Sequence, residues 1–403
     1  MTASDFDNID GLDRWRREFP ILATTVYMIS NSLGAMPAAA ADSLADYART
    51  WATRGVRAWE ERWWEMSREI GDTIGGLIGA PAGSVSMHAN VTTATAVALS
   101  CLQPVPRRNR IVCLESDFPS IIYLLREMQS VGWELIIVPA ESDFSVQVDR
   151  VVDAIDHRTA LVHLSHVLFK TSYIMNPAPI VAAAHHHGAL VLLDGYQSAG
   201  IIPVDVAALG VDFFTGGCLK WLCGGPGAAF LATRPDLLPK LRPRLTGWLA
   251  HRAPFAFDTD PLVPRDDAMR MMGGTPPISA YYASLPGLDI IKAVGVDRIR
   301  ARSKQMTARV LALAEKHGFP SIAPRDPERL AGTVAVDPPD ALPVSRALKA
   351  RDFLVDYRPG VGIRISPHFY NTMDEIDRTM ATLADIVERK AYDRDAPARS
   401  VVT

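Results

Sequence analysis

The sequence predicts an α/β protein with a mainly parallel central sheet flanked by helices, followed by a smaller α+β C-terminal domain. Short apolar runs alternate with helical segments between residues 85 and 214, and this alternation is typical of βαβ units. From Ala280 the pattern changes to long amphipathic helices followed by short strands. With 403 residues and 48% hydrophobic content, the chain can bury a substantial core and form two domains.

We expect four segments in order along the chain. They are an N-terminal arm (1–44), a large domain (45–279), a small C-terminal domain (280–393) and a flexible tail (394–403). The arm carries a short charged helix, Asp13 to Phe19, and a β-branched strand, Thr25 to Ile29. Helices are then expected over Ala38 to Arg54, which ends at Gly55, and over Met66 to Ile78.

The large domain should contain a series of buried strands. Their expected ranges are Val85 to His88, Arg110 to Leu114, Glu134 to Val138, Ala160 to Leu164, Ala189 to Leu193 and Val211 to Phe214. Later segments predict two further helices and three short strands. The helices are Val296 to Lys316 and Met373 to Arg389, and the strands begin at Thr333, Phe353 and Val361.

Composition excludes several classes of function. A net charge of −3 gives no electrostatic footprint for nucleic acid or an anionic membrane. The four cysteines form no C-x-x-C pair, which argues against a disulfide framework or structural zinc. We also expect no metal at His185-His186-His187, because adjacent helical residues point in different directions. Without a long apolar run or a signal-like N-terminus, we expect a soluble cytoplasmic protein.

The candidate site centres on Asp194 and Lys220. Asp194 ends an apolar strand, and Lys220 follows the next strand and precedes the glycine-rich turn Gly224 to Gly227. Strand ends of a parallel sheet meet at one edge, so both side chains should face one cleft. Taken singly, the aspartate could be a helix cap and the lysine a surface charge. Together they suit pyridoxal phosphate (PLP), which uses a lysine Schiff base and a carboxylate at its ring nitrogen.

This stretch resembles class V PLP enzymes of the aspartate aminotransferase fold (fold type I), and most of all the kynureninases. The resemblance rests on the lysine followed by an aromatic residue and a leucine, Lys220-Trp221-Leu222, with GGPG shortly after. It extends from Asn31 to Arg364. It implies that Lys220 holds PLP and that Asp194 keeps the ring nitrogen protonated.

The resemblance also implies further cofactor contacts. Asn90, Val91 and Thr92 form a strand-to-helix turn whose backbone N–H groups would bind the PLP phosphate, although an ordinary helix cap has the same pattern. Phe118 would stack on the pyridine ring, with Ser120 close by. The other expected cofactor contacts are Thr171 and Gln197.

On the substrate side, the resemblance implies roles for residues from distant parts of the chain. Asn31 and Ser32 would close over the substrate carboxylate, and Arg364 would bind it as a bidentate clamp. Trp64 and His166 would line the substrate site. The alternatives are a simple loop, a surface ion pair, a packing aromatic and a hydrogen-bonded core histidine.

Two motifs imply an obligate homodimer with shared active sites. Thr246-Gly247-Trp248 and Gly274-Thr275-Pro276 match family motifs in which Trp248 and Thr275 would reach the phosphate of the neighbouring subunit. Trp248 could instead be a packing aromatic.

Several departures from the kynureninase pattern leave the reaction open. Gln197 stands where kynureninases carry histidine, Leu219 where they carry tyrosine, Ile121 where they carry aspartate and Ser172 where they carry glycine. The leading hypothesis is hydrolytic Cβ–Cγ cleavage of an amino acid that releases alanine. The alternatives are an aminotransferase, a C–S lyase, an epimerase or a non-catalytic PLP-binding homologue. A desulfurase is disfavoured, because no cysteine lies on an evident mobile loop in the C-terminal half.

Overall fold

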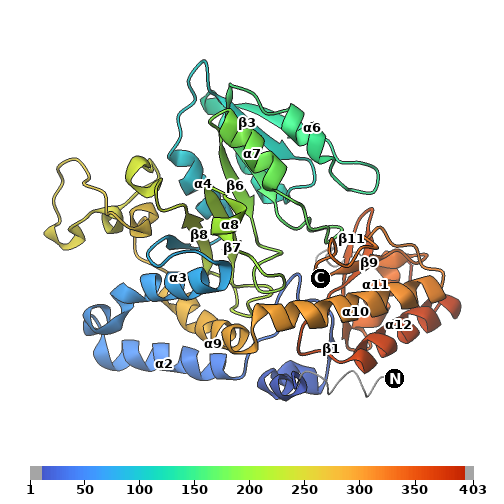
Figure 1. Cartoon of the computed structure of the whole chain (residues 1–403). Coiled ribbons are helices and arrows are strands. Elements are labelled where there is room, and N and C mark those ends of the chain that lie inside the picture. The colour runs from blue at the N-terminus through green and yellow to red at the C-terminus, as the bar shows by residue number, and fades with distance from the viewer. Residues whose placement is uncertain (1–10, 395–403) are drawn as a thin grey trace.

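The computed structural model describes residues 11–394, and a seven-stranded sheet stands at its centre (Figure 1). The strand order is β2-β8-β7-β6-β5-β3-β4. The strands are β2 (Val85–His88), β3 (Arg110–Leu114), β4 (Glu134–Val138), β5 (Thr159–Ser165), β6 (Leu190–Asp194), β7 (Phe213–Gly217) and β8 (Ala229–Thr233). Strands β3 to β7 pair in parallel, while β8 runs antiparallel to both β7 and β2. The predicted α/β fold with a mainly parallel sheet is confirmed.

Alternating residues of the strands feed two cores on opposite faces of this sheet. In β3, Val112 and Leu114 belong to one core, and Ile111 and Cys113 belong to the other, as the two-residue period of a strand requires. The helices between the strands are α4 (Val91–Ser100), α5 (Pro119–Glu127), α6 (Val148–Asp153), α7 (Ala178–His186) and α8 (Val206–Leu209).

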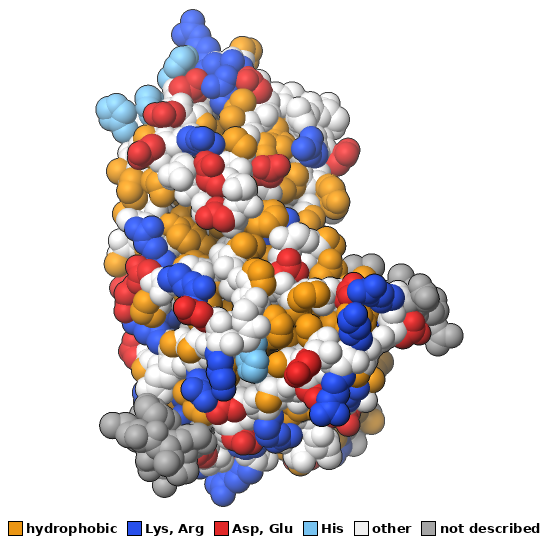
Figure 2. Space-filling model, turned by 90° about the vertical axis from the view of Figure 1, so that its right-hand side faces the viewer, with side chains coloured by type: hydrophobic (Ala, Val, Ile, Leu, Met, Phe, Trp, Pro, Cys, Tyr) orange, Lys and Arg blue, Asp and Glu red, His pale blue; other side chains and the backbone are white. Residues whose placement is uncertain are grey.

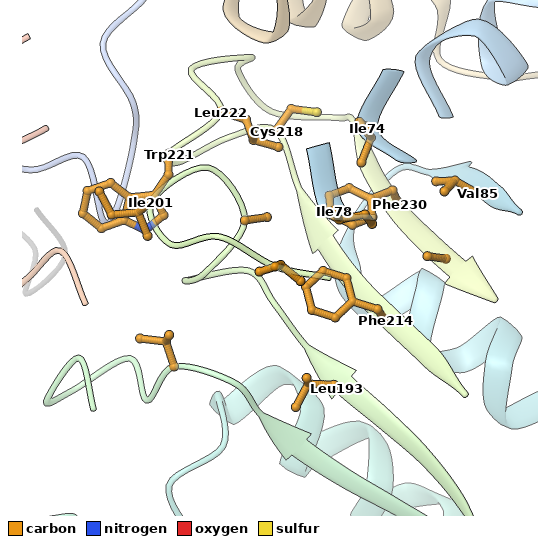
Figure 3. Packing of buried hydrophobic residues seen from close by; sticks show 14 of the residues in the cluster. Ile74, Ile78, Val85, Leu193, Ile201, Phe214, Cys218, Trp221, Leu222 and Phe230 are labelled. Carbon is orange, nitrogen blue, oxygen red and sulfur yellow. The ribbon is translucent and has the colours of Figure 1, made fainter. Parts of the chain in front are cut away.

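The first of these cores lies against helices from both ends of the large domain. These are α2 (Ala39–Arg54), α3 (Trp64–Ile78) and α9 (Ile278–Val294), which lie together beside the sheet in Figure 1. Figure 3 shows Ile74 and Ile78 of α3 next to Phe230 of β8, with Phe214 of β7 nearby. This apolar layer supports the strand ends that carry the polar residues of the site.

A second domain, orange to red in Figure 1, has its own core. Its antiparallel sheet has the order β11-β12-β9, formed by β9 (Val334–Val336), β11 (Asp356–Arg358) and β12 (Gly362–Ile365). Its helices are α10 (Val296–Lys316), α11 (Ala341–Lys349) and α12 (Met373–Glu388), of which α12 begins with a capping box between Thr372 and Glu375.

The N-terminal arm is attached to this second domain. Strand β1 (Val26–Tyr27) pairs in parallel with β10 (Phe353–Leu354). The Arg16 side chain forms an ion pair with Glu375, with 2.7 Å between Nη2 and Oε1. Short helical turns complete the chain: η1 (Asp13–Glu18), η2 (Pro20–Ala23), η3 (Trp59–Trp63), η4 (Met128–Val131), η5 (Leu238–Lys240), η6 (Trp248–Ala250), η7 (Pro254–Ala256) and η8 (Ala268–Met271).

The structure corrects the sequence expectation at two strands. The strand expected at Val211 begins at Phe213 and continues to Gly217, because pairing with β8 overrides the low strand propensity of Gly216 and Gly217. Strand β8 was not expected, since it follows directly on the glycine-rich turn. The expected flexible tail lies almost entirely outside the described residues.

No helix within residues 11–394 combines the length and the apolar character that crossing a membrane requires. Figure 2 shows lysine and arginine side chains interspersed with aspartate and glutamate on the face that it presents, without a field of one sign.

Candidate active site

A cavity of about 220 Å³ lies at the carboxyl ends of β5, β6 and β7. The sequence predictions that it brings together are Asn90, Val91, Thr92, Phe118, Ser120, Asp194, Gln197 and Lys220. It is also lined by residues that were not assigned a contact there, namely Ser165, Val167, Phe169, Tyr196 and Leu219. Strand ends of a parallel sheet are where ligands bind in open α/β folds.

Lys220 lies in the loop after β7, and hydrogen bonds between backbone groups at the two ends of this loop hold it closed. The Gly224 amide donates to the Cys218 carbonyl at 2.7 Å, and the Cys218 amide donates to the Ala228 carbonyl at 2.8 Å. Lys220 Nζ lies 4.5 Å from the ring centroid of Tyr196 and 5.8 Å from that of Phe118.

The environment makes Lys220 a weak base. Burial lowers the pKa of Lys220 to about 7; the charges of Arg364 and Arg358 act in the same direction, and Asp194 opposes them. A large fraction of the amine is therefore neutral at neutral pH, as attack on a carbonyl carbon requires.

Asp194 lies buried at the end of β6, where Oδ1 accepts a hydrogen bond from the Tyr196 amide at 2.8 Å. Burial raises the pKa of Asp194, and the charges of His163 and Lys220 oppose this. A cationic N–H group against the carboxylate would remove the cost of burying it. The site therefore fits the protonated ring nitrogen of PLP.

A second buried carboxylate lies under the same strand ends. Asp117 Oδ1 accepts hydrogen bonds from the Ser165 amide at 2.8 Å and the Ser165 hydroxyl at 2.6 Å. Asp117 Oδ2 is 2.9 Å from His163 Nδ1. Although burial alone would lower it, the pKa of His163 is raised by Asp117 and Asp194. The positive charge of His163 helps to keep Asp194 ionised, while the negative charge of Asp117 opposes this.

The phosphate end of the cavity is the start of α4. Asn90 caps this helix, because its Oδ1 accepts the Thr93 amide at 2.9 Å. A helix start offers unpaired N–H groups and the positive end of the helix dipole to an anion. Val91 and Thr92, in the first turn, line the cavity, so this end also fits the cofactor.

The orientation of Gln197 is fixed by its neighbours. The indole N–H of Trp221 donates to Gln197 Oε1 at 3.0 Å, and an indole N–H can only donate. The amide nitrogen, Nε2, donates to the Asn31 carbonyl at 3.0 Å. One N–H of the amide remains for an acceptor in the cavity.

Arg364 is buried and paired, so it is no surface ion pair. Its Nε donates to Asp356 Oδ1 at 2.8 Å, Nη2 donates to Oδ2 of the same carboxylate, and Nη1 donates to the Phe169 carbonyl at 2.5 Å. A guanidinium has five N–H groups, so two of them remain for a further carboxylate. Arg358 also contacts Asp356, at 3.1 Å.

Other predicted residues lie next to the cavity but do not line it. The His166 amide donates to the Asp194 carbonyl at 2.9 Å, while burial lowers the pKa of its imidazole to about 4 and keeps it neutral. Thr171 Oγ1 accepts the Tyr173 amide at 3.3 Å. Asn31 is buried with no hydrogen-bond partner for its side-chain amide within the described residues. Ser32 is half-buried beside it.

Trp64, Trp248 and Thr275 are not among the residues that line the cavity. The two tryptophan rings meet edge to face, with 5.4 Å between their centroids. Trp64 also stacks on Trp59, and Trp248 stacks on Phe257. Thr275 is exposed.

The cavity residues that sequence reasoning missed have a common explanation. Ser165 and Val167 flank His166, and side chains alternate along an extended segment, so choosing the histidine selected the wrong side. Phe169 and Tyr196 belong to turns, whose side-chain directions no periodicity predicts. Leu219 was noted only as a departure from a family pattern.

Comparisons with known proteins show the family of the chain. The model of the class V aminotransferase family matches residues 26–379. The kynureninase of Pseudomonas fluorescens is 30% identical over 402 residues, which cover 96% of this chain and 95% of the relative. The kynureninase of Shouchella clausii is 28% identical and covers 99% of this chain and 97% of the relative.

Solved structures show the same fold at lower identity. An apo cysteine desulfurase from Thermococcus onnurineus NA1 has a TM-score of 0.82 at 20% identity, covering 93% of this chain and 98% of that one. A lysine-to-alanine mutant of the cystine C–S lyase C-DES, with glycine covalently linked to its PLP cofactor, has a TM-score of 0.82 at 21% identity. That match covers 92% of this chain and 99% of that one.

Proposed function

The chain belongs to the class V aminotransferase family, and on this basis we propose that it is a PLP-dependent, kynureninase-like hydrolase. The observation that carries the proposal is the meeting of Lys220, a weakly basic amine, and Asp194, a buried carboxylate, in one cavity. The substrate would be an amino acid with a carbonyl group at Cγ. Water and this amino acid would give alanine, the carboxylate of the remaining acyl group and one proton.

Each residue has a task that its surroundings support. Bound PLP supplies an electron-withdrawing ring that stabilises negative charge at Cα. Lys220 holds the cofactor and then, as a free amine, takes the Cα proton. Asp194 pairs with the ring nitrogen, and the remaining N–H of Gln197 is free for the phenolic oxygen. The two remaining N–H groups of Arg364 suit the α-carboxylate.

We also propose a homodimer with shared active sites. Trp248 and Trp64 belong to an aromatic cluster with Phe255 and Phe257, which are 54% and 73% exposed. The segment that carries Trp248 and both phenylalanines projects from the body beyond α2 and α3, yellow in Figure 1. Exposed aromatic rings gathered in one place favour a protein interface. The cytoplasmic location stays a prediction from the sequence.

The test combines a spectrum with a product assay. The purified protein should absorb in the visible range, lose this absorbance on borohydride reduction, and release alanine from L-kynurenine or 3-hydroxykynurenine. Lys220→Ala should remove both signals. Colour without alanine would overturn the hydrolase proposal and favour an aminotransferase, C–S lyase or epimerase. A colourless protein that takes up no added PLP would favour a non-catalytic homologue.

A further inference from the structure

The cavity holds few groups that can exchange a proton. Of the side chains that line it, those of Asp194, Tyr196 and Lys220 titrate. Asp194 is committed to the ring nitrogen in the proposed function, which leaves Tyr196 and Lys220. His166, which lies next to the cavity without lining it, stays neutral because burial lowers its pKa to about 4.

The backbone around Tyr196 brings its ring against the lysine. Residue 195 must be glycine, because a Cβ there would lie 1.9 Å from Cζ of Phe214. A Cβ at Gly217 would lie 2.7 Å from the Cε2, Cζ and hydroxyl atoms of Tyr196, so the phenol lies flat on this glycine at the end of β7. The Tyr196 amide is held by Asp194 Oδ1 at 2.8 Å, and Lys220 Nζ lies 4.5 Å from the ring centroid.

The hydroxyl of Tyr196 has no structural role that its hydrogen bonds would show. It makes no hydrogen bond with any residue in the described part of the chain, although the ring is half-buried. Burial, assisted by the nearby Cys218 and Asp194, raises the pKa of the Tyr196 phenol above its ordinary value. The group therefore carries its proton at neutral pH and can act as an acid.

The proposed reaction needs a second acid at this point. Lys220 takes the proton from Cα and returns it there at the end, so it is occupied in between. When the Cβ–Cγ bond breaks, the bonding electrons stay on Cβ, which must gain a proton to become the methyl group of alanine. We propose that the Tyr196 hydroxyl donates this proton, which makes Tyr196 a further catalytic residue. Water supplies two protons: one restores the phenol after its donation to Cβ, and the other is the proton released with the carboxylate product, so the step balances.

This inference rests on the proposed function, and the test uses its product, L-alanine. By microscopic reversibility, the group that protonates Cβ also removes methyl protons from bound alanine. In D₂O the PLP-loaded wild type should exchange both the Cα proton and the methyl protons of L-alanine for deuterium, and proton NMR measures both rates. In Tyr196→Phe the rate of Cα exchange should stay within about threefold of the wild-type rate. The rate of methyl exchange and the rate of alanine release from kynurenine should both fall by about 10²–10⁴-fold. Tyr123→Phe, at an exposed tyrosine (68%), is the matched control and should behave as the wild type.

Two further readouts do not depend on turnover. The PLP dissociation constant of Tyr196→Phe should stay within about twofold of the wild type, because the ring remains. The near-ultraviolet tyrosinate titration of the apoprotein should lose one phenol that ionises above the ordinary range.

The outcomes separate the two proposals. If the wild type releases alanine and Tyr196→Phe exchanges methyl protons equally fast, the inference is wrong and the hydrolase stands. If Cα exchange and PLP affinity fall together with methyl exchange, Tyr196 only positions the site, and the inference is wrong as well. A wild type that neither releases alanine nor exchanges methyl protons would overturn the hydrolase itself.

Discussion

Lys220 shows how one side chain acquires its chemistry from position alone. It lies in an apolar cavity between two aromatic rings, with the guanidinium groups of Arg364 and Arg358 close enough to disfavour its ammonium form. Asp194 is the main charge that opposes them. The balance gives an amine that is half-protonated near neutral pH instead of near the ordinary lysine value.

The pH dependence of cofactor uptake follows from this balance. Because only the neutral amine attacks the PLP aldehyde, the rate at which the apoprotein takes up PLP should rise as pH increases through about 7 and then level off. Asp194→Asn removes the anion that raises the pKa, so its midpoint should move to lower pH. Stopped-flow absorbance across a pH series measures both midpoints. A wild-type rate that still rises steeply towards the ordinary lysine pKa would contradict the buried-amine explanation.

Asp356 holds Arg364, the arginine that we propose binds the substrate carboxylate. It is fully buried and contacts both Arg364 and Arg358. Asp356→Asn leaves these guanidinium charges without a buried counter-ion, so the free energy of unfolding should fall by about 3–5 kcal/mol. KM for the amino acid should rise as well, because Arg364 loses its orientation.

Urea unfolding measures the stability loss. The matched control is Asp385→Asn, whose partner Arg389 is largely exposed, and it should cost no more than about 1 kcal/mol. Equal costs for the two variants would show that the buried pair has no special role.

At the scale of elements, the contact between α3 and β2 depends on which face of the helix carries glycine. A Cβ at Gly71 would lie 2.6 Å from the Val85 carbonyl oxygen, whereas a Cβ at Gly76 meets nothing within 4 Å. Both glycines lie inside the same helix, where alanine is the better helix former. The substitution should therefore have opposite signs at the two positions.

We expect Gly76→Ala to stabilise the protein by roughly 0.5–1 kcal/mol. Gly71→Ala should destabilise it, because the helix must move away from the backbone of β2 and open a gap in the core. Thermal unfolding of both variants beside the wild type tests this. Stabilisation by Gly71→Ala would mean that the helix can shift at no cost.

Periodicity in the sequence predicted the elements whose pattern is local. β2, β3 and β4 have the limits that were expected, because β2 alternates apolar and polar residues and because β3 and β4 are isolated, mainly apolar runs. The end of β7 and all of β8 were not predicted, because Gly216 and Gly217 have low strand propensity and β8 follows a glycine-rich turn; pairing with β6, with β2 and with each other makes them strands. In the site, Asp194 and Lys220 were found because they follow strands, while Tyr196 was missed because its ring direction depends on the absence of side chains at Gly195 and Gly217.

At the scale of the whole molecule, the N-terminal arm contacts both the core of the second domain and the loop that carries Lys220. Val26 and Met28 belong to the core of the second domain. A few residues later, the Gly34 amide donates to the Leu219 carbonyl at 2.9 Å, beside Lys220. The predicted domain limits stay a prediction. Helix α9 packs in the first core, although the limit at residue 279 places nearly all of this helix in the second domain.

Subunit complementation tests whether two chains share each active site. Lys220→Ala lacks the cofactor lysine, and the double variant Trp248→Ala, Thr275→Ala lacks the residues proposed to reach the neighbouring subunit. If the sites are shared, activity should appear when the two inactive variants are unfolded together and refolded as a mixture. A hybrid dimer would then combine one intact Lys220 with the intact Trp248 and Thr275 of the other chain.

Random pairing makes half of the dimers hybrids with one native site each, so roughly one quarter of the wild-type activity should return. If hybrids form, as two affinity tags would show, and no activity returns, then Trp248 and Thr275 serve the site of their own chain or only the packing of the aromatic cluster.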